Sequence, residues 1–382
     1  MIDFSKLLMK LMAINYPTSG DLAMCDNAKR FRAVRSQLAK AHPIQPRGNF
    51  ARHLDTLAGL VSGIVGSKSV NLPKVALEVP DGNKPSSREK KFCRLIDNQS
   101  IDFERYFLPY VKTMLSNLGG EILVIAIDGS TVGRGCITLM ASVIFQGRSL
   151  PIAWLVVRGK KGHLAESFHL ELLNSLKDIV PDGKQVVIVG DGEFDGIRLQ
   201  DYVKSCGWNY VCRTGVNISI VWNGHEVKCG DATESLEPGK YIIFKDILFT
   251  EERYGPVNVV CYWRKGYKDP IFLVTSIDSA GRACALYRLR FRIETLFSDK
   301  KSRGFNIHKS HLSDPERISR LLIAVSLAYI WIVFLGVVAK TEGWVGIIHR
   351  TKRCDLSLFQ LGLRFLEHLI NRGMRVIVLF SF

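Results

Sequence analysis

The sequence lacks several patterns that would assign its chemistry directly. Its nine cysteines include no CxxC pair, so neither a disulfide framework nor a zinc cage of paired cysteines is indicated. Free thiols in a reducing compartment agree with this spacing. The chain also has no Walker loop and no GxSxG element. Phosphate-loop enzymes and hydrolases with a serine elbow are therefore not predicted.

Acidic residues are few compared with basic ones. The 382 residues contain 52 Lys and Arg but only 36 Asp and Glu, a formal charge of +16. This excess predicts a polyanionic partner, with nucleic acid as the first candidate and an anionic membrane surface as the second. The apolar content of 47% is ordinary for a globular protein, and the length suffices for two or three domains.

Long apolar runs are also scarce. Lys6 and Lys10 interrupt the apolar stretch at the amino terminus, so a signal peptide is not expected. One run, residues 321–339, has 19 uncharged residues and is long enough to cross a bilayer. The alternative is a fully buried core helix, which we predict because the remaining chain is typical of a soluble α/β protein and no second span follows.

The first segment of the chain is predicted to be mostly helical. Residues 28–41 form a basic amphipathic helix that suits a phosphate backbone or an anionic surface, although a solvated charged face is the plainer interpretation of any one residue. Its residues are Lys29, Arg30, Arg32, Arg35 and Lys40 around Phe31, Val34 and Leu38. Residues 50–65 and 102–117 are also expected to be helices, and residues 81–87 (DGNKPSS) a linker.

The middle of the chain changes to short apolar runs. Three strands are predicted first, with a tight turn at Gly147-Arg148, and they are followed by helix, strand, helix, strand. The strands are 121–128, 136–146, 150–157, 185–190 and 208–212, and the helices are 164–179 and 194–205. Residues 214–276 are predicted to be rich in strands, with a hairpin signal at Asn223-Gly224.

Residues 287–301 (YRLRFRIETLFSDKK) are predicted to form one helix with a polar stripe. At about 100° per residue, Tyr287, Arg290, Glu294 and Lys301 fall within roughly 60° of one another. The adjacent face, with Leu289 and Ile293, is expected to pack on the core. The stripe suits a metal-dependent phosphate enzyme, but ion pairing along a solvated helix would give the same pattern.

Two aspartates are predicted at strand ends. Asp128 ends EILVIAID and Asp191 follows QVVIVG, and ligands gather at the carboxyl ends of strands in α/β sheets. With Glu294 they make an all-oxygen set, which suits Mg²⁺ or Mn²⁺ rather than zinc. Two such ions about 4 Å apart can activate an attacking oxygen and stabilise a leaving oxygen. Alternatively, each Asp-Gly pair is only a turn or a helix cap.

A second basic cluster lies between a strand and a helix, in the sequence RGKKGH. Arg158, Lys160, Lys161 and His163 are close together there. Binding to a DNA backbone and a solvated loop are equally good interpretations of this cluster.

This order of elements resembles the ribonuclease-H-like fold of the DDE transposases. In that fold the acids lie on the first strand, just after the fourth strand, and on the last helix, where this chain has Asp128, Asp191 and Glu294. The helix also matches Y-x2-R-x3-E-x6-K, the signature of the IS-four family of insertion-sequence transposases. DGEF at 191–194 resembles the D-x-x-F motif of that family. The resemblance covers residues 120–340 well, and the flanks only in character.

The resemblance implies a fold and a function. The fold would be an α/β ribonuclease-H-like core with a β-rich insertion and a mostly helical, DNA-binding N-terminal region. The protein would be a DNA transposase that binds terminal inverted repeats and performs metal-dependent phosphodiester hydrolysis and strand transfer into target DNA. The alternatives are a catalytically silent DNA-binding descendant or a membrane-associated basic protein. The predicted segments are 1–117, 118–213, 214–276, 277–340 and 341–382.

The resemblance also implies roles for single residues. Asp128, Asp191 and Glu294 would be catalytic and would hold two Mg²⁺ ions, with Mn²⁺ as a substitute. Tyr287, Arg290 and Lys301 would bind the phosphates at the transposon end. Trp222 and Trp263 are candidates for stacking on a DNA base, although either is more often a core or hairpin residue and neither belongs to the catalytic set. A homodimer on paired DNA ends, no membrane, and a cytoplasmic location with the nucleoid complete the expectation.

Overall fold

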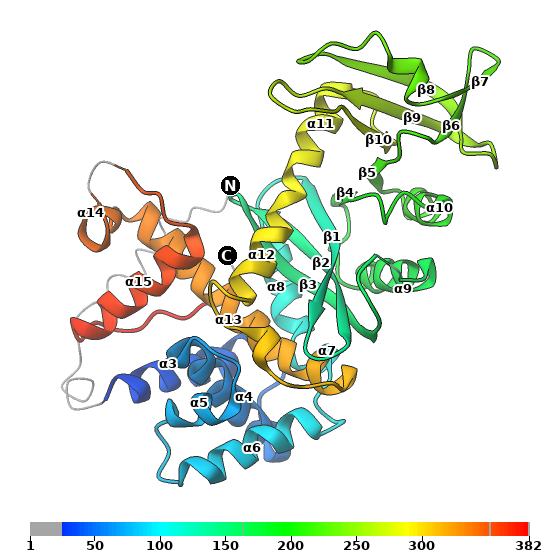
Figure 1. Cartoon of the computed structure of the whole chain (residues 1–382). Coiled ribbons are helices and arrows are strands. Elements are labelled where there is room, and N and C mark those ends of the chain that lie inside the picture. The colour runs from blue at the N-terminus through cyan, green and yellow to red at the C-terminus, as the bar shows by residue number, and fades with distance from the viewer. Residues whose placement is uncertain (1–24, 163, 351–352, 381–382) are drawn as a thin grey trace. The chain divides into compact units, whose positions relative to one another are not determined.

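The computed structural model describes residues 25–162, 164–350 and 353–380 (Figure 1). Its contacts divide the chain into two compact units. We call them the helical unit (Met1–Gly120, Thr131–Cys136 and Phe297–Phe382) and the sheet unit (Glu121–Ser130 and Ile137–Leu296). The five predicted segments stay predictions. His163 and the start of the first segment lie outside the described residues.

The N-terminal part of the helical unit consists of helices, as predicted. They are α3 (Asp26–Ala41), α4 (Gly48–Ser67), α5 (Leu72–Leu77), α6 (Pro85–Asp97), α7 (Phe103–Tyr106) and α8 (Leu108–Asn117). The single helix expected over 102–117 is wrong, because the chain breaks between α7 and α8 at Phe107. Pro109 explains the break, since proline cannot donate the helical hydrogen bond and its ring clashes with the preceding turn.

Arg30 corrects the interpretation of α3 as a helix whose cations all face outward. Its side chain is buried beside Val34 and Leu38. There Nη2 donates to Glu78 Oε2 (2.8 Å) and Nε donates to the Ser62 carbonyl (2.9 Å). Arg30 is therefore a buried cation with acceptors on two other parts of the unit, and it is not available to a phosphate backbone.

The apolar run predicted as a core helix is α13 (Pro315–Thr341). Asp314 caps it by accepting from Arg317 N (2.8 Å). The helix is long and apolar enough to cross a membrane, but its apolar window is entirely buried in the structure, as expected for a core helix. It packs on α15 (Leu358–Asn371) and α4. The unit also contains η2 (Ile307–Lys309) and α14 (Val345–Ile348).

The sheet unit is built on a ten-stranded mixed sheet. Its first five strands are β1 (Ile122–Val132), β2 (Cys136–Phe145), β3 (Arg148–Arg158), β4 (Gln185–Gly190) and β5 (Asn209–Thr214). With α9 (Glu166–Lys177) and α10 (Ile197–Ser205) they follow the predicted order of elements. The tight turn lies one residue earlier than predicted, at Gln146 and Gly147, which both have positive φ. This matches the primed turns that suit two-residue hairpins.

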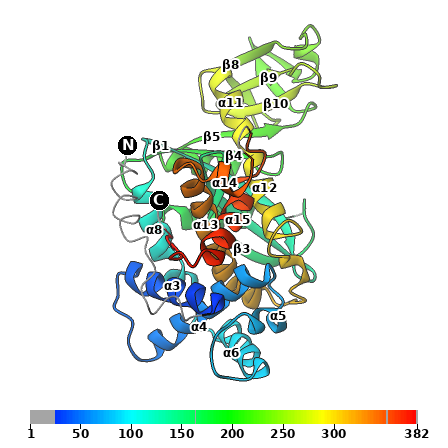
Figure 2. The same cartoon turned by 90° about the vertical axis from the view of Figure 1, so that its left-hand side faces the viewer.

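The strand-rich segment continues the same sheet. Its strands are β6 (Ser219–Trp222), β7 (His225–Lys228), β8 (Tyr241–Phe249), β9 (Tyr254–Tyr262) and β10 (Ile271–Thr275), with η1 (Asp231–Thr233) between β7 and β8. The order across the sheet is β3-β2-β1-β4-β5-β10-β9-β8-β6-β7. Figure 2 shows β8, β9 and β10 beyond β5. The insertion therefore joins the predicted core through the antiparallel pairing of β5 with β10.

The helix predicted over 287–301 is two helices, α11 (Ala280–Leu289) and α12 (Phe291–Lys300). At the junction, Arg290 N bonds to Tyr287 O and Ile293 N bonds to Arg290 O, both at 3.0 Å. These three-residue bonds tighten the turn, although Arg290 keeps right-handed helical angles. In the sheet unit, α9 and α10 lie on one side of the sheet and α11 on the other (Figure 1).

Candidate active site

The sheet register brings Asp128 and Asp191 to the same level on neighbouring strands. Strands β1 and β4 are parallel, and their last residue pair is Ala126 with Val189. Asp128 and Asp191 each follow two residues later, so they are adjacent on the same face of the sheet. Contrary to the prediction, Asp128 does not end its strand, because β1 continues to Val132. What ends before Asp128 is the pairing with β4.

Asp128 is a buried carboxylate with cations on both sides. It is 1% exposed. Lys161 Nζ lies 3.2 Å from Oδ1, and Arg290 Nη1 lies 3.7 Å from Oδ2. Burial raises the pKa of Asp128, the charge of Lys161 opposes that shift, and the charge of Asp191 adds to it. The two aspartates are therefore close enough to repel each other when both are ionised.

A turn holds Asp191 in place after β4. Its Oδ1 accepts a hydrogen bond from Glu193 N (3.1 Å), and its carbonyl accepts one from Phe194 N (3.1 Å). Gly190 is needed before this turn because a Cβ there would lie 2.7 Å from the Phe194 side chain. Phe194 is fully buried. The DGEF sequence thus anchors a phenyl ring in the core and leaves the Asp191 carboxylate half-buried at the strand end.

Arg290 connects Asp128 to the helix residues of the predicted stripe. Its Nη2 donates to Glu294 Oε1 (2.8 Å), and its guanidinium lies 5.7 Å from the centre of the Tyr287 ring. It also lies 4.5 Å from the centre of the Phe291 ring. One guanidinium therefore contacts Asp128 and Glu294 and keeps their carboxylates near each other. Its Nε is buried without a hydrogen-bond partner among the described residues.

The stripe is more buried than the helical wheel predicts. Tyr287 and Arg290 are 3% and 6% exposed, whereas Leu289 is only half-buried. The expected packing face is therefore right for Ile293, which is fully buried, and wrong for Leu289. Burial raises the pKa of the Tyr287 phenol, and the charge of Arg290 opposes that shift. The Glu294 side chain remains 51% exposed.

The remaining predicted residues have the following surroundings. Lys301 belongs to the helical unit, where Nζ donates to Thr131 Oγ1 (3.3 Å), so its grouping with Glu294 stays a prediction. Trp222 is 42% exposed and packs edge-on against Phe244. Trp263 donates from Nε1 to the Tyr267 carbonyl (2.9 Å).

Sequence reasoning missed a buried pair behind Asp191. His169 Nε2 and Glu193 Oε1 lie 3.8 Å apart, and both atoms are buried without a hydrogen-bond partner among the described residues. The His169 ring also lies 4.6 Å from the Phe194 ring. Burial raises the pKa of Glu193, and the charge of Asp191 adds to the shift. The only sequence signal was the position of Glu193 inside DGEF.

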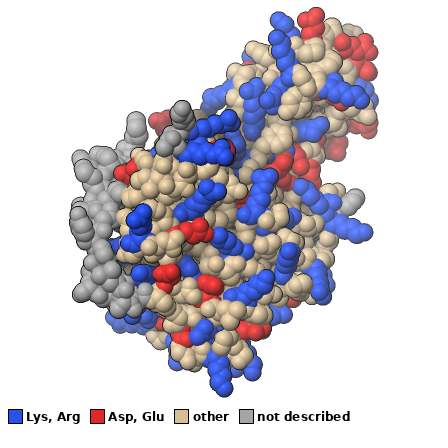
Figure 3. Space-filling view, turned by 60° about the vertical axis from the view of Figure 1, so that its left-hand side comes forward, with Lys and Arg blue, Asp and Glu red and all other residues tan. Residues whose placement is uncertain are grey.

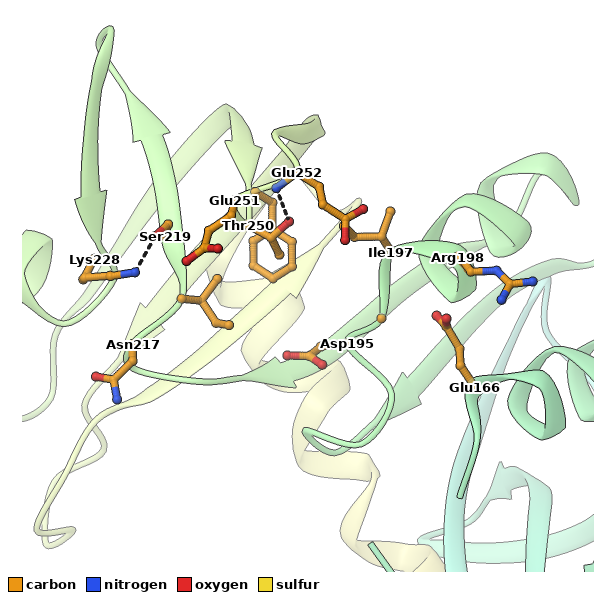
Figure 4. Close-up of a pocket in the computed structure, with 13 residues that line it drawn as sticks. Glu166, Asp195, Ile197, Arg198, Asn217, Ser219, Lys228, Thr250, Glu251 and Glu252 are labelled. Atoms are coloured by element: carbon orange, nitrogen blue, oxygen red, sulfur yellow. Dashed lines mark hydrogen bonds between the residues drawn. The ribbon is translucent and has the colours of Figure 1, made fainter. Parts of the chain in front are cut away.

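A separate acidic cleft of about 550 Å³ lies in the same unit (Figure 4). Glu166, Asp195, Glu251 and Glu252 line it, together with Arg198 and Lys228. Two of these acids have structural tasks. Glu166 Oε1 accepts from Leu199 N in the first turn of α10 (3.2 Å), and Asp195 Oδ2 accepts from the Thr214 hydroxyl (2.7 Å). Neither Asp128 nor Asp191 lines this cleft.

Basic side chains are distributed widely over one face of the molecule. Figure 3 shows Lys and Arg spread over the visible face, with groups of Asp and Glu between them. The net charge of +16 is thus not collected into one patch on this face. An electrostatic contribution to DNA binding would come from many positions.

The acids do not form a closed metal cage. In the described part of the chain, no three His, Cys, Asp or Glu side chains are arranged closely enough to hold a metal ion.

A model of the transposase DDE domain matches residues 95–331, which is more than half of the chain. The chain belongs to the transposase DDE domain family. No curated protein matches it.

A solved structure is also similar to this DDE domain chain. It is described as a cryo-EM structure of the piggyBac transposase synaptic complex with hairpin DNA. Its TM-score is 0.48 at 14% identity, over 94% of this chain and 83% of that one. DDE transposases are typically enzymes and generally use divalent metal ions. The buried Asp128 fits such an ion. A hard cation would offset both the cost of burying the carboxylate and its repulsion by Asp191.

Proposed function

We propose that the protein is a metal-dependent DNA transposase of the IS-four type with a ribonuclease-H-like core. The observation that carries this proposal is the placement of Asp128 and Asp191 at one level of neighbouring parallel strands. Arg290 joins Asp128 to Glu294 in the same place. The family match, the acids and the Y-x2-R-x3-E-x6-K spacing support the same reaction.

The site residues would divide the work between metal and DNA. Asp128 and Asp191 would hold divalent ions, with Glu294 joining them when it leaves Arg290. When bound, Mg²⁺ or Mn²⁺ supplies Lewis-acid stabilisation of a phosphodiester and lowers the pKa of a bound water. Arg290 and Tyr287 would orient a phosphate beside the acids, since a guanidinium matches phosphate oxygens in bidentate geometry. Lys301 would add a third phosphate contact.

The substrates would be the terminal inverted repeats of an element and a target DNA. Water attack would nick the end, and the freed 3′-hydroxyl would then join the target strand. Two ends must be held together for this reaction, so a homodimer on DNA is part of the proposal. Its location would be the cytoplasm, with the nucleoid, and the mostly helical N-terminal region would contribute to DNA binding.

The test is nicking of a supercoiled plasmid that carries the ends of the element. We expect Asp128→Asn, Asp191→Asn and Glu294→Gln each to lower the nicking rate by about 10³-fold or more, because each removes a charge from the site. The matched control is Glu251→Gln, an exposed acid outside the site, which should keep the wild-type rate. Full nicking by the Asp128→Asn protein would refute the mechanism.

A catalytically silent DNA-binding protein is the second candidate. The ion pair of Glu294 with Arg290 favours this second candidate, because a Glu294 carboxylate that is bonded to Arg290 is not directed at a metal ion. This candidate predicts binding to the ends without nicking in Mg²⁺ or Mn²⁺. An Arg290→Gln variant distinguishes an ion site that Arg290 blocks from acids that no longer form an ion site. Removing the guanidinium frees Glu294, which would strengthen Mn²⁺ binding only if the acids still form a site.

A further inference from the structure

Asp128 has two cationic neighbours that are held very differently. The Arg290 side chain is 7% exposed and lies against the rings of Tyr287 and Phe291 while it bonds to Glu294. The Lys161 side chain is 49% exposed and makes its ion pair with Asp128 alone among the described residues. Arg290 is therefore fixed by packing, and Lys161 is free to leave.

The backbone around Lys161 suits such an exchange. Lys161 follows the end of β3 in a turn, and Gly162 beside it adopts φ 82°, a conformation that glycine accepts without strain. A Cβ at Gly162 would meet no heavy atom within 4 Å. Because the Lys161 side chain itself is 49% exposed, its ammonium group has solvent into which it can move away from Asp128.

The Lys161 ammonium group is within hydrogen-bond distance of a carboxylate oxygen of Asp128. Lys161 Nζ lies 3.2 Å from Asp128 Oδ1, on the carboxylate that also repels Asp191. An ammonium group and a divalent ion cannot both occupy the coordinating side of one carboxylate oxygen, because they repel each other and compete for the same lone pairs.

We propose that Lys161 is a resident counterion that holds the place of a divalent ion at Asp128, and that the ion must displace it to bind. The inference rests on the proposed function, because it takes Asp128 as an ion ligand. Lys161 is then a positioning residue. In the ion-free protein it pairs with the buried carboxylate, and this contact competes with ion binding.

The first experiment measures Mn²⁺ binding to the full chain without DNA, by electron paramagnetic resonance of the free ion. Lys161→Met should bind Mn²⁺ about tenfold more tightly than wild type, because one charge-assisted contact no longer competes. The matched control is Lys160→Met, which removes the same charge from the neighbouring exposed position and should change the affinity about twofold at most. A general loss of structure would weaken binding, which is the opposite sign.

The second experiment follows the lysine itself. We expect Mn²⁺ to increase acylation of Lys161 by an amine reagent severalfold, as measured by mass spectrometry, while acylation of Lys160 in the same segment stays constant. In Asp128→Asn protein, Lys161 should be fully reactive with or without Mn²⁺.

The outcomes separate this inference from the proposed function. If Asp128→Asn abolishes Mn²⁺ binding while Lys161→Met binds no more tightly than wild type, the counterion role is refuted and the ion site stands. If Mn²⁺ binding survives in Asp128→Asn, the ion does not use Asp128, and both proposals fail. Tighter binding in Lys161→Met that matches Lys160→Met would also refute the role, since it would reflect general charge.

Discussion

The packing of α13 against α15 gives the sharpest test of the core. The two helices approach through Gly336 and Gly362, whose backbones face each other. A Cβ added at Gly362 would overlap the carbonyl of Ile332 and would lie 2.9 Å from Gly336 N. These neighbours are backbone atoms of a long helix, so no side-chain rotation can relieve the overlap and the helices must separate.

Gly362→Ala should therefore destabilise the helical unit. Overpacking of this kind costs typically 1–3 kcal/mol, and about 1 kcal/mol more is lost if separation disrupts the adjacent stacking of Tyr329 on Phe359, whose rings lie 5.4 Å apart. Alanine regains about 1 kcal/mol in helix propensity. The net expectation is about 2 kcal/mol, which corresponds to a fall in Tm of about 4–8 °C for a unit of this size.

The assay is thermal unfolding followed by circular dichroism, with Gly59→Ala as the matched control. Gly59 is also a buried glycine in a helix of the same unit, but a Cβ there would meet Phe92 at an ordinary 3.5 Å. That variant should keep the wild-type Tm or gain a few degrees. Equal Tm values for Gly362→Ala and Gly59→Ala would refute the proposed backbone contact.

Three further perturbations test other charged groups. Glu78→Gln leaves Arg30 buried without its anion and should lower the free energy of unfolding, measured by urea denaturation, by about 3 kcal/mol. Asp55→Asn, which breaks the exposed pair with Arg35, should lower it by about 1 kcal/mol or less, and equal effects of the two variants would contradict the burial of Arg30. Burial lowers the pKa of Lys300 from 10.5 to about 7, so between pH 8 and 9 the unfolded chain binds a proton that the folded chain does not. The free energy of unfolding should therefore rise by about 1.4 kcal/mol per pH unit in this range. Lys300→Met should remove this slope, and an unchanged slope would refute the assignment to Lys300. Arg290→Lys keeps the charge but cannot contact both carboxylates, so plasmid nicking should fall at least about tenfold, and a wild-type rate would show that the bridge is dispensable.

Much of the fold could be predicted because it depends on local patterns. Apolar period and turn residues predicted the strand and helix order from β1 to β5 and the buried α13. The pairing of β5 with β10 could not be predicted in this way, because it joins residues about 60 positions apart and depends on which strand edges remain open. The break at Phe107 has a local cause in Pro109, whose effect on the helix outweighs the apolar period of the segment.

The candidate site was predictable in its residues but not in its contacts. Strand ends pointed to Asp128 and Asp191, and helical spacing pointed to Tyr287, Arg290 and Glu294. A helical wheel gives directions around one axis, so it could not predict that Arg290 turns inward to Asp128. Nor could it show that Arg30, in a helix rich in cations, is buried against Glu78. Both contacts depend on partners from distant parts of the sequence.

The continuous pairing from β1 to β7 has a mechanical consequence. A hinge between the insertion and the strands β1 and β4 that precede Asp128 and Asp191 would have to break the hydrogen bonds of the four residue pairs between β5 and β10. The insertion is therefore better suited to transmit torsion than to swing as a lid. A spectroscopic label at the Asn223-Gly224 turn, at the far edge of the sheet, would report a twist of β1 and β4 when a ligand binds beside Asp191.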